Sequence, residues 1–333
     1  MTVIRTWRPP VVDGAEVAKF RRSFDGACFE FGHQLGKHPL FAIEQLMDLA
    51  GRMIAMGGAD QVVGFSATRG GPERKFDQLA RRDSARDALA DIEEGSSWLR
   101  MSFVQAYDPR YREIHDQILD DAEFFSGFPL GRNLSWSSMT VMVSSPTVVT
   151  PYHIDHESNL LFQIAGEKDI WLFDANDSRV LAEEEIENFY IGNIHAASFR
   201  PDAKALGARF HLSPGRGVYN PPLGPHWVKN GGAVSVSVSL NFSLRPSEQR
   251  ARVYQMNYYL RRMGRRPSPP KNAGVVDLLK GAAMRIGAVG RPRNLDELLQ
   301  PGPRRLWKRL RRFHRSSGRK LPSPERSGQP SSG

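Results

Sequence analysis

The chain has almost no cysteine and no long apolar run. Its 333 residues include a single cysteine, Cys28, which excludes an internal disulfide and agrees with a reducing compartment. No apolar stretch approaches the roughly 20 residues that a membrane-spanning helix requires. The first ten residues also lack the apolar core of a signal peptide. These absences predict a cytoplasmic protein.

Acidic residues are scarce in the last part of the chain. From Arg261 onward there are 19 Lys and Arg residues against 4 Asp and Glu residues, whereas residues 1–260 contain 27 against 32. The net charge of +10 is therefore carried by a strongly basic end on a mildly acidic body. Hydrophobic residues make up 40% of the chain, enough for a substantial core in one large domain or two smaller ones.

A short strand pattern carries a histidine and an aspartate two residues apart. If residues 150–168 begin as a β-strand, His153 and Asp155 leave the same face. An imidazole and a carboxylate are two of the three protein ligands of the 2-His-1-carboxylate triad, which binds Fe(II) and leaves positions open. His226 is the best candidate for the third ligand, because a long connection can bring it back beside this pair.

The residue types alone leave alternatives open. A hydrogen-bonded pair in the core and an unrelated histidine would give the same pattern, and the ligand set does not distinguish iron from zinc or manganese. His156 should point to the opposite strand face, so we do not expect it to be a ligand. His33 and His38 flank a turn and are more simply explained as capping or solvent-exposed residues.

The surroundings of the metal pair resemble the JmjC and cupin-like Fe(II)/2-oxoglutarate oxygenases, most closely the asparaginyl hydroxylase that acts on hypoxia-inducible factor. That family carries a Thr-Pro-x-His-x-Asp run, further polar residues at set offsets, and a distal His followed later by Asn. The matching positions are Thr150, His153, Asp155, Asn159, Gln163, Gly166, Lys168, His226 and Asn241. The resemblance covers residues 134–244 and implies Fe(II), 2-oxoglutarate and O2 as cofactors.

The resemblance also implies roles for the residues around the metal ligands. Lys168 would pair with the distal carboxylate of 2-oxoglutarate and Thr150 would supply it with a hydroxyl, while Asn241 and Asn159 would assist the same cosubstrate. Many related oxygenases instead use an arginine ten residues beyond the distal histidine, where Val236 stands here. A buried lysine needs an anionic partner to remain charged. The alternative is a solvated lysine beside a turn.

Residues 233–244 alternate without a break. The valines share one face and the serines share the other with Asn241: Val234, Val236 and Val238 against Ser235, Ser237 and Ser239. A polar stripe on an interior strand is costly unless it lines a wet or ligand-filled cavity. The alternative is an edge strand whose serine face lies in water.

Many short strands at this spacing, together with the metal motif, predict a mainly β fold. We expect a double-stranded β-helix, the jelly-roll or cupin architecture, with flanking α-helices at both ends. The expected strands are 27–33, 61–66, 98–107, 139–143, 148–154, 159–164, 170–173, 209–212, 217–219 and 233–244. The expected helices are 39–52, 72–94, 111–125, 248–263 and 275–286. For residues 175–206 we predict an inserted loop with a short acidic helix at 183–187, near the mouth of the barrel.

These elements predict four regions along the chain. Residues 1–133 form a mixed α/β buttress, and residues 134–245 form the JmjC or cupin-like catalytic core. Residues 246–300 form C-terminal helices whose apolar faces suit a homodimer, although packing onto the same chain explains them almost as well. Residues 301–333 form a basic tail that is partly disordered.

The tail contains a segment with an amphipathic pattern. If residues 304–315 are helical, Leu306, Leu310 and Phe313 share one stripe among cations, as in an interfacial helix. We therefore expect peripheral docking on the anionic inner face of a membrane. Nucleic acid would satisfy the charges without needing the apolar stripe, so it is the less favoured partner.

Three classes of function remain after this comparison. The first is an oxygenase that hydroxylates a protein side chain. The second is a hydroxylase of a small molecule or a lipid-linked sugar at the membrane surface. The third is a catalytically silent cupin-like regulator that binds nucleic acid through its tail. The intact set of expected metal and cosubstrate residues argues against the third, because a binding module does not need Lys168 and Asn241 together.

Overall fold

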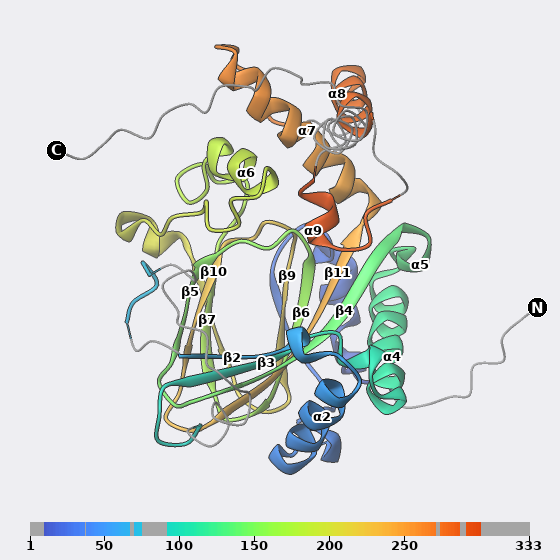
Figure 1. The fold of residues 1–333 in the computed structure, drawn as a ribbon, viewed down its shortest axis with the longest axis vertical. Helices are drawn as coiled ribbons and strands as arrows, with labels where there is room; N and C mark the ends of the chain where they lie inside the picture. Colours follow the sequence, from blue (N-terminus) through green and yellow to red (C-terminus); the bar gives the residue numbers. More distant parts are fainter. Residues whose placement is uncertain are drawn as a thin grey trace, which may run out of the picture.

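The structure is a computed structural model, and it describes residues 10–36, 38–66, 70–74, 92–270, 274–286 and 291–300. Its centre is a pair of antiparallel β-sheets that face each other, with helices outside them and at one end (Figure 1). The predicted fold class is confirmed: the chain is mainly β, with a jelly-roll core and flanking helices.

The two sheets differ in size. In spatial order, the larger sheet consists of β1 (Phe29–Gly32), β9 (Arg216–Asn220), β6 (Ser158–Ala165), β11 (Ser235–Leu244), β4 (Leu134–Ser144), β3 (Ser97–Met101) and β2 (Val62–Ser66). The smaller sheet consists of β5 (Val149–His153), β10 (His226–Asn230), β7 (Lys168–Leu172) and β8 (Ala208–Leu212). Ten of these strands lie at the expected places, and β10 was not predicted.

The strand expected at residues 98–107 is too long. β3 ends at Met101, because Phe103 adopts a left-handed backbone with φ of 58° and a 3-10 helix at Val104–Ala106 follows it. The helix expected at 72–94 lies largely outside the described residues.

The helices form two groups (Figure 1). Packed beside the larger sheet are α1 (Val17–Ser23), α2 (Ile43–Ala55), α4 (Pro109–Ser126) and α5 (Leu130–Asn133). At one end of the sheets lie α6 (Glu183–Tyr190), α7 (Arg245–Arg262), α8 (Val275–Arg285) and α9 (Leu295–Leu298). Short 3-10 helices occur at Gly14–Glu16, Pro39–Phe41, Ala59–Gln61 and Pro201–Leu206. The helices predicted near 39–52, 111–125, 248–263 and 275–286 are confirmed.

The central strand β11 separates an apolar core from a polar interior. Its valines at 236 and 238 are buried in the main hydrophobic core with residues of α1, α2 and α4. Its serines face the space between the two sheets, and Ser235 and Ser237 are fully buried. Because β6 and β4 pair with β11 on either side, the alternative of an edge strand with its serine face in water is wrong.

The predicted acidic helix of the insert is confirmed as α6. His156 anchors it, because its Nδ1 lies 2.9 Å from the Tyr190 hydroxyl of α6 and its Nε2 lies 2.8 Å from Oγ of Ser243 in β11. Burial lowers the pKa of His156 to about 3, so this imidazole is neutral. His156 is thereby a structural tie between the insert and the larger sheet.

The C-terminal helices leave an apolar face exposed. α8 packs against α7 (Figure 1), while Val275, Val276 and Leu279 of α8 are exposed. The homodimer stays a prediction, and the segment 304–315 lies outside the described residues. In the part of the chain that the structure describes, no helix has the length and apolar character needed to cross a bilayer.

Gly166→Ala should destabilise the protein. Gly166 lies in the β6–β7 turn with φ of +66°, and an added Cβ would lie 2.3 Å from the Val234 carbonyl oxygen. The left-handed conformation and the clash with backbone should lower the free energy of unfolding by about 1–3 kcal/mol in urea titrations. Gly232→Ala is the control, since its Cβ meets nothing within 4 Å. Equal unfolding midpoints for the two variants would contradict this account.

Candidate metal centre

Strand pairing brings the two histidines together. His226 opens β10 and is the register partner of His153, which ends β5. Asp155 follows two residues later, with its Oδ2 3.8 Å from Nε2 of His153 and 3.7 Å from Nε2 of His226. The three potential ligand atoms lie within 4.8 Å of one another. The three candidate ligands predicted from the sequence therefore converge on one point.

Backbone carbonyls fix the tautomers of both imidazoles. Nδ1 of His153 lies 2.7 Å from the Pro151 oxygen, and Nδ1 of His226 lies 3.0 Å from the Gly224 oxygen. A carbonyl can only accept, so each Nδ1 is protonated and each Nε2 presents its lone pair toward Asp155. Burial, and then the neighbouring His153, lower the pKa of His226. Its neutral form is the one that ligates metals.

The arrangement fits a divalent metal better than a hydrogen-bonded core. The 3.7 and 3.8 Å separations exceed normal hydrogen-bond lengths but leave space for an ion between the atoms. Two imidazole nitrogens and one carboxylate oxygen are the donors of the facial triad. Asp155 is 42% exposed in its side chain, which leaves one side of the centre open. The same donors would also accept zinc or manganese.

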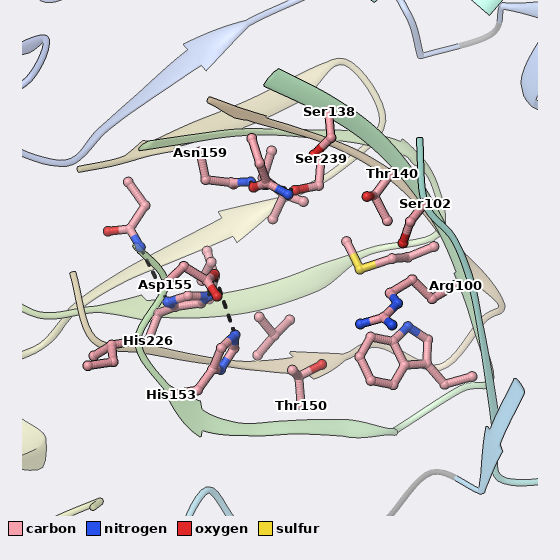
Figure 2. A pocket seen from close by; sticks show the side chains of 18 of the residues that line it. Arg100, Ser102, Ser138, Thr140, Thr150, His153, Asp155, Asn159, His226 and Ser239 are labelled. Carbon is pink, nitrogen blue, oxygen red and sulfur yellow. Dashed lines mark hydrogen bonds and ion pairs between the residues drawn. The ribbon is translucent and has the colours of Figure 1, made fainter. Parts of the chain in front are cut away.

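A cavity of about 550 Å³ lies between the two sheets and includes the three residues in its wall. Figure 2 shows the triad at one side of this cavity and Arg100 at the opposite side. Thr150, Asn159, Lys168 and Asn241, which the sequence predicted to surround the cosubstrate, also line it. The structure thus gathers all seven predicted site residues in one space.

Lys168 is a buried cation at the cavity wall. It is 6% exposed, so the alternative of a solvated lysine is wrong. Desolvation by burial lowers its pKa to about 7. No ion pair to it occurs among the described residues, and its lowered pKa has no opposing contribution from a carboxylate. An anion bound in the cavity beside Lys168 would stabilise its charged form.

Hydrogen bonds divide the polar interior into a closed part and an open part. The Gln163 side chain donates to Oγ of Ser235 at 3.0 Å and accepts from Ser237 at 2.7 Å, so these groups are satisfied within the chain. Nearer the triad, the Asn159 amide donates to Oδ1 of Asn241 at 2.5 Å. Asn159 and Asn241 line the cavity. Gln163 is not part of the cavity wall, and its side chain links β6 to β11.

Several residues of the cavity wall were not predicted from the sequence. Arg100 of β3, Ser102 beyond it, and Ser138 and Thr140 of β4 line the cavity (Figure 2). The alternation of residues 98–101 puts Trp98 and Arg100 on one face, but only the pairing of Arg100 with Met142 of β4 turns that face inward. The insert was expected at the mouth of the barrel, and its residues Phe189, Ile194 and His195 do line the cavity.

Comparison with known proteins gives one family and a group of distant structures. The model of the cupin-like domain family matches residues 66–248. The structure of Escherichia coli YcfD is 14% identical, with a TM-score of 0.47, over 88% of this chain and 70% of that chain. YcfD, a ribosomal oxygenase from Escherichia coli, in complex with cobalt and 2-oxoglutarate is 14% identical, with a TM-score of 0.44, over 89% of this chain and 64% of that chain. No curated protein matches the chain.

Loss of one histidine should strongly weaken metal binding. We expect His226→Ala to weaken binding of Mn(II) on the order of a hundredfold or more in calorimetric titrations, because one of three protein ligands is removed. His211→Ala is the matched control, since that imidazole lies on β8 and is 56% exposed beside Asp169. Unchanged stoichiometry and affinity in His226→Ala would refute the assignment of this centre.

Proposed function

Because the chain belongs to the family of cupin-like domains, whose model matches residues 66–248, we propose that it is an Fe(II)/2-oxoglutarate-dependent oxygenase that hydroxylates a protein side chain. His153, Asp155 and His226 would hold the iron. Lys168, Thr150, Asn241 and Asn159 would hold the cosubstrate.

One observation carries the proposal: a buried lysine, which forms no ion pair with any residue that the structure describes, shares a cavity with three residues able to ligate a metal. A zinc or manganese site that served only as a structural centre would gain nothing from a desolvated ammonium nearby. An anionic cosubstrate that reaches from the metal to the lysine explains both features. The ammonium would then form a charge-assisted pair, which is among the strong polar interactions in a low-dielectric site.

The residues present fit this cosubstrate and its metal. Both Nε2 atoms face Asp155 with their lone pairs, as facial ligation of Fe(II) requires. When bound, Fe(II) and 2-oxoglutarate supply the oxidation, in which O2 and the cosubstrate yield succinate, carbon dioxide and one oxygen atom inserted into a substrate C–H bond. The chain's own part is to orient the cosubstrate and to exclude bulk water from the cavity.

The cosubstrate residues come from both sheets. Lys168 of β7 and Thr150 of β5 lie on the smaller sheet and would bind the distal carboxylate. Asn159 of β6 and Asn241 of β11 are register partners in the larger sheet and would lie near the carboxylate that binds the metal. Apolar side chains of Leu161, Ile170 and Val228 line the cavity with them, so the space would be dry once filled.

The position ten residues beyond His226 supports the choice of Lys168. Val236 stands there and is buried in the core with the helices, 2% exposed. It points away from the cavity, because its neighbours Ser235 and Ser237 bond Gln163 on the opposite face. Val236 therefore stands where many related oxygenases have an arginine that binds the cosubstrate. In this chain, Lys168 would take that role.

The resemblance of the motif favours a protein side chain as the substrate. The insert residues Phe189 and Ile194 at the cavity wall would contact such a substrate as it enters. A small molecule or a lipid-linked sugar remains the alternative substrate. The silent regulator is the less favoured reading, because it gives Lys168 no anion to bind.

Succinate formation tests the assigned reaction. Purified protein with Fe(II), 2-oxoglutarate and O2 should convert cosubstrate to succinate, and a substrate should gain 16 Da in mass spectra of proteins or metabolites. His153→Ala should abolish succinate formation with the fold retained, because the metal loses a ligand. His211→Ala should retain it. Normal turnover in His153→Ala would exclude this function.

Lys168→Ala should raise the 2-oxoglutarate requirement far more than it changes metal affinity. Removing one partner of a buried charge-assisted pair costs a few kcal/mol, on the order of a hundredfold in binding. Titration of 2-oxoglutarate into the Mn(II)-loaded protein would measure the change. Lys229→Ala is the matched control, since Lys229 on β10 is exposed. An unchanged cosubstrate affinity in Lys168→Ala would assign the distal carboxylate to another cation.

A further inference from the structure

The outward face of α8 is apolar along its whole length. Five large apolar side chains of α8 and its C-cap are between 54% and 72% exposed: Val275, Val276, Leu278, Leu279 and Ile286. Because an α-helix has about 3.6 residues per turn, these five positions fall within one half of the helix surface. The charged residues of α8 all lie outside that half. Figure 1 shows α8 at the end of the molecule beyond the two sheets.

The opposite face of α8 carries its polar groups and packs on α7 (Figure 1). Asp277, Gly281 and Met284 are the buried residues of this helix. Lys280 donates to Oδ1 of Asn257 on α7 at 2.8 Å, and its ammonium lies 3.8 Å from the Asp277 carboxylate. A helix at the surface of a globular protein normally has the reverse arrangement, with its apolar face inward. The apolar half of α8 is therefore suited to a partner rather than to water.

Exposed arginines border α8 on both sides along the chain. Arg265 and Arg266 precede the helix, Arg285 lies in its last turn, and Arg291 follows it. Residues 261–300 as a whole contain nine Lys and Arg against three Asp and Glu. An apolar helix face bordered by cations is typical of a helix that lies in the interface of an anionic membrane.

A second copy of the chain fits this face less well. α8 has 11 residues, so it is about 16 Å long and roughly 10 Å wide, and one side of it offers at most a few hundred Å². A stable dimer buries about 800 Å² on each partner. A symmetric contact through α8 would also bring the arginines of both copies together. An anionic bilayer accepts a small apolar face and attracts the arginines around it.

We propose that the outward face of α8 docks the protein on an anionic lipid surface. Val275, Leu279 and Ile286 would lie at the boundary of the acyl chains, and the flanking arginines would contact the lipid headgroups. This docking does not depend on the proposed function, and it is separate from the segment 304–315, which lies outside the described residues. The docking is reversible, because one short helix face buries too little apolar surface for permanent anchoring.

Cosedimentation of the protein with vesicles tests this surface. Vesicles of equimolar phosphatidylglycerol and phosphatidylcholine should bind it, and vesicles of phosphatidylcholine alone should bind it far more weakly. A variant with both Val276→Gln and Leu279→Gln should lose about tenfold or more in partition, since two apolar side chains no longer enter the bilayer. Arg285→Gln should lose about fivefold. All three residues are exposed, so these variants should keep the fold.

Two variants on the other side of the larger sheet serve as matched controls. Phe124→Gln is the control for the apolar change, because Phe124 on α4 is 67% exposed. Arg132→Gln is the control for the charge, because Arg132 on α5 is exposed. Each should leave the vesicle partition within about twofold. Amide hydrogen exchange at residues 275–286 gives a direct measurement, and anionic vesicles should slow it.

Three results would overturn the docking surface. Equal partition of the α8 double variant and the unaltered protein would assign any lipid affinity to another segment. Unchanged amide exchange at residues 275–286 on anionic vesicles would exclude contact of α8 with the lipid. A dimer in sedimentation velocity that the double variant dissociates would assign the face to a second copy. Succinate formation is expected in all of these variants, so failure of the docking surface and failure of the oxygenase function are distinguishable.

Discussion

The pairing of β10 with β5 is the interaction on which the metal centre depends. It makes His226 and His153 register partners, so backbone hydrogen bonds set their separation. A slip of one residue would turn His226 to the other face of the smaller sheet. The Leu223 amide adds a second tie, since it donates to the Asp155 carbonyl at 2.8 Å. The two segments are distant in the sequence, yet their ligand atoms are placed by the backbone.

The larger sheet gives the cavity its polarity. Its outer face contributes valines and leucines to the core beneath the N-terminal helices, which stabilises the strands whatever their inner face carries. The inner face is then available for serine and asparagine side chains. Most of their hydrogen bonds are made within the chain, as those of Ser237 and Asn159 are. Lys168 differs from them, because its ammonium is buried and forms no ion pair with a residue in the described part of the chain.

Local patterns account for what the sequence could predict. His153 and Asp155 follow from the two-residue period of a strand, and the face of β11 follows from its unbroken alternation. Arg100 escaped notice because its inward direction depends on the register between β3 and β4. Phe103 is not a glycine, so its residue type did not predict a left-handed backbone conformation. β10 was not predicted, because it has only five residues and follows a segment rich in proline and glycine. Such a segment is typical of a turn and gave no sign of a short strand after it.

The last described segment of the chain completes the cavity. Leu295 of α9 is part of the wall, and Arg252 and Gln255 of α7 donate to the Leu298 carbonyl at 3.0 and 2.9 Å, which ties α9 to α7. Synthesis proceeds from the N-terminus, so this wall leaves the ribosome after all three metal-ligand residues and after every strand of the two sheets. A chain trimmed by proteolysis ahead of residue 291 would keep His153, Asp155 and His226 and lose Leu295 from the wall of its cavity.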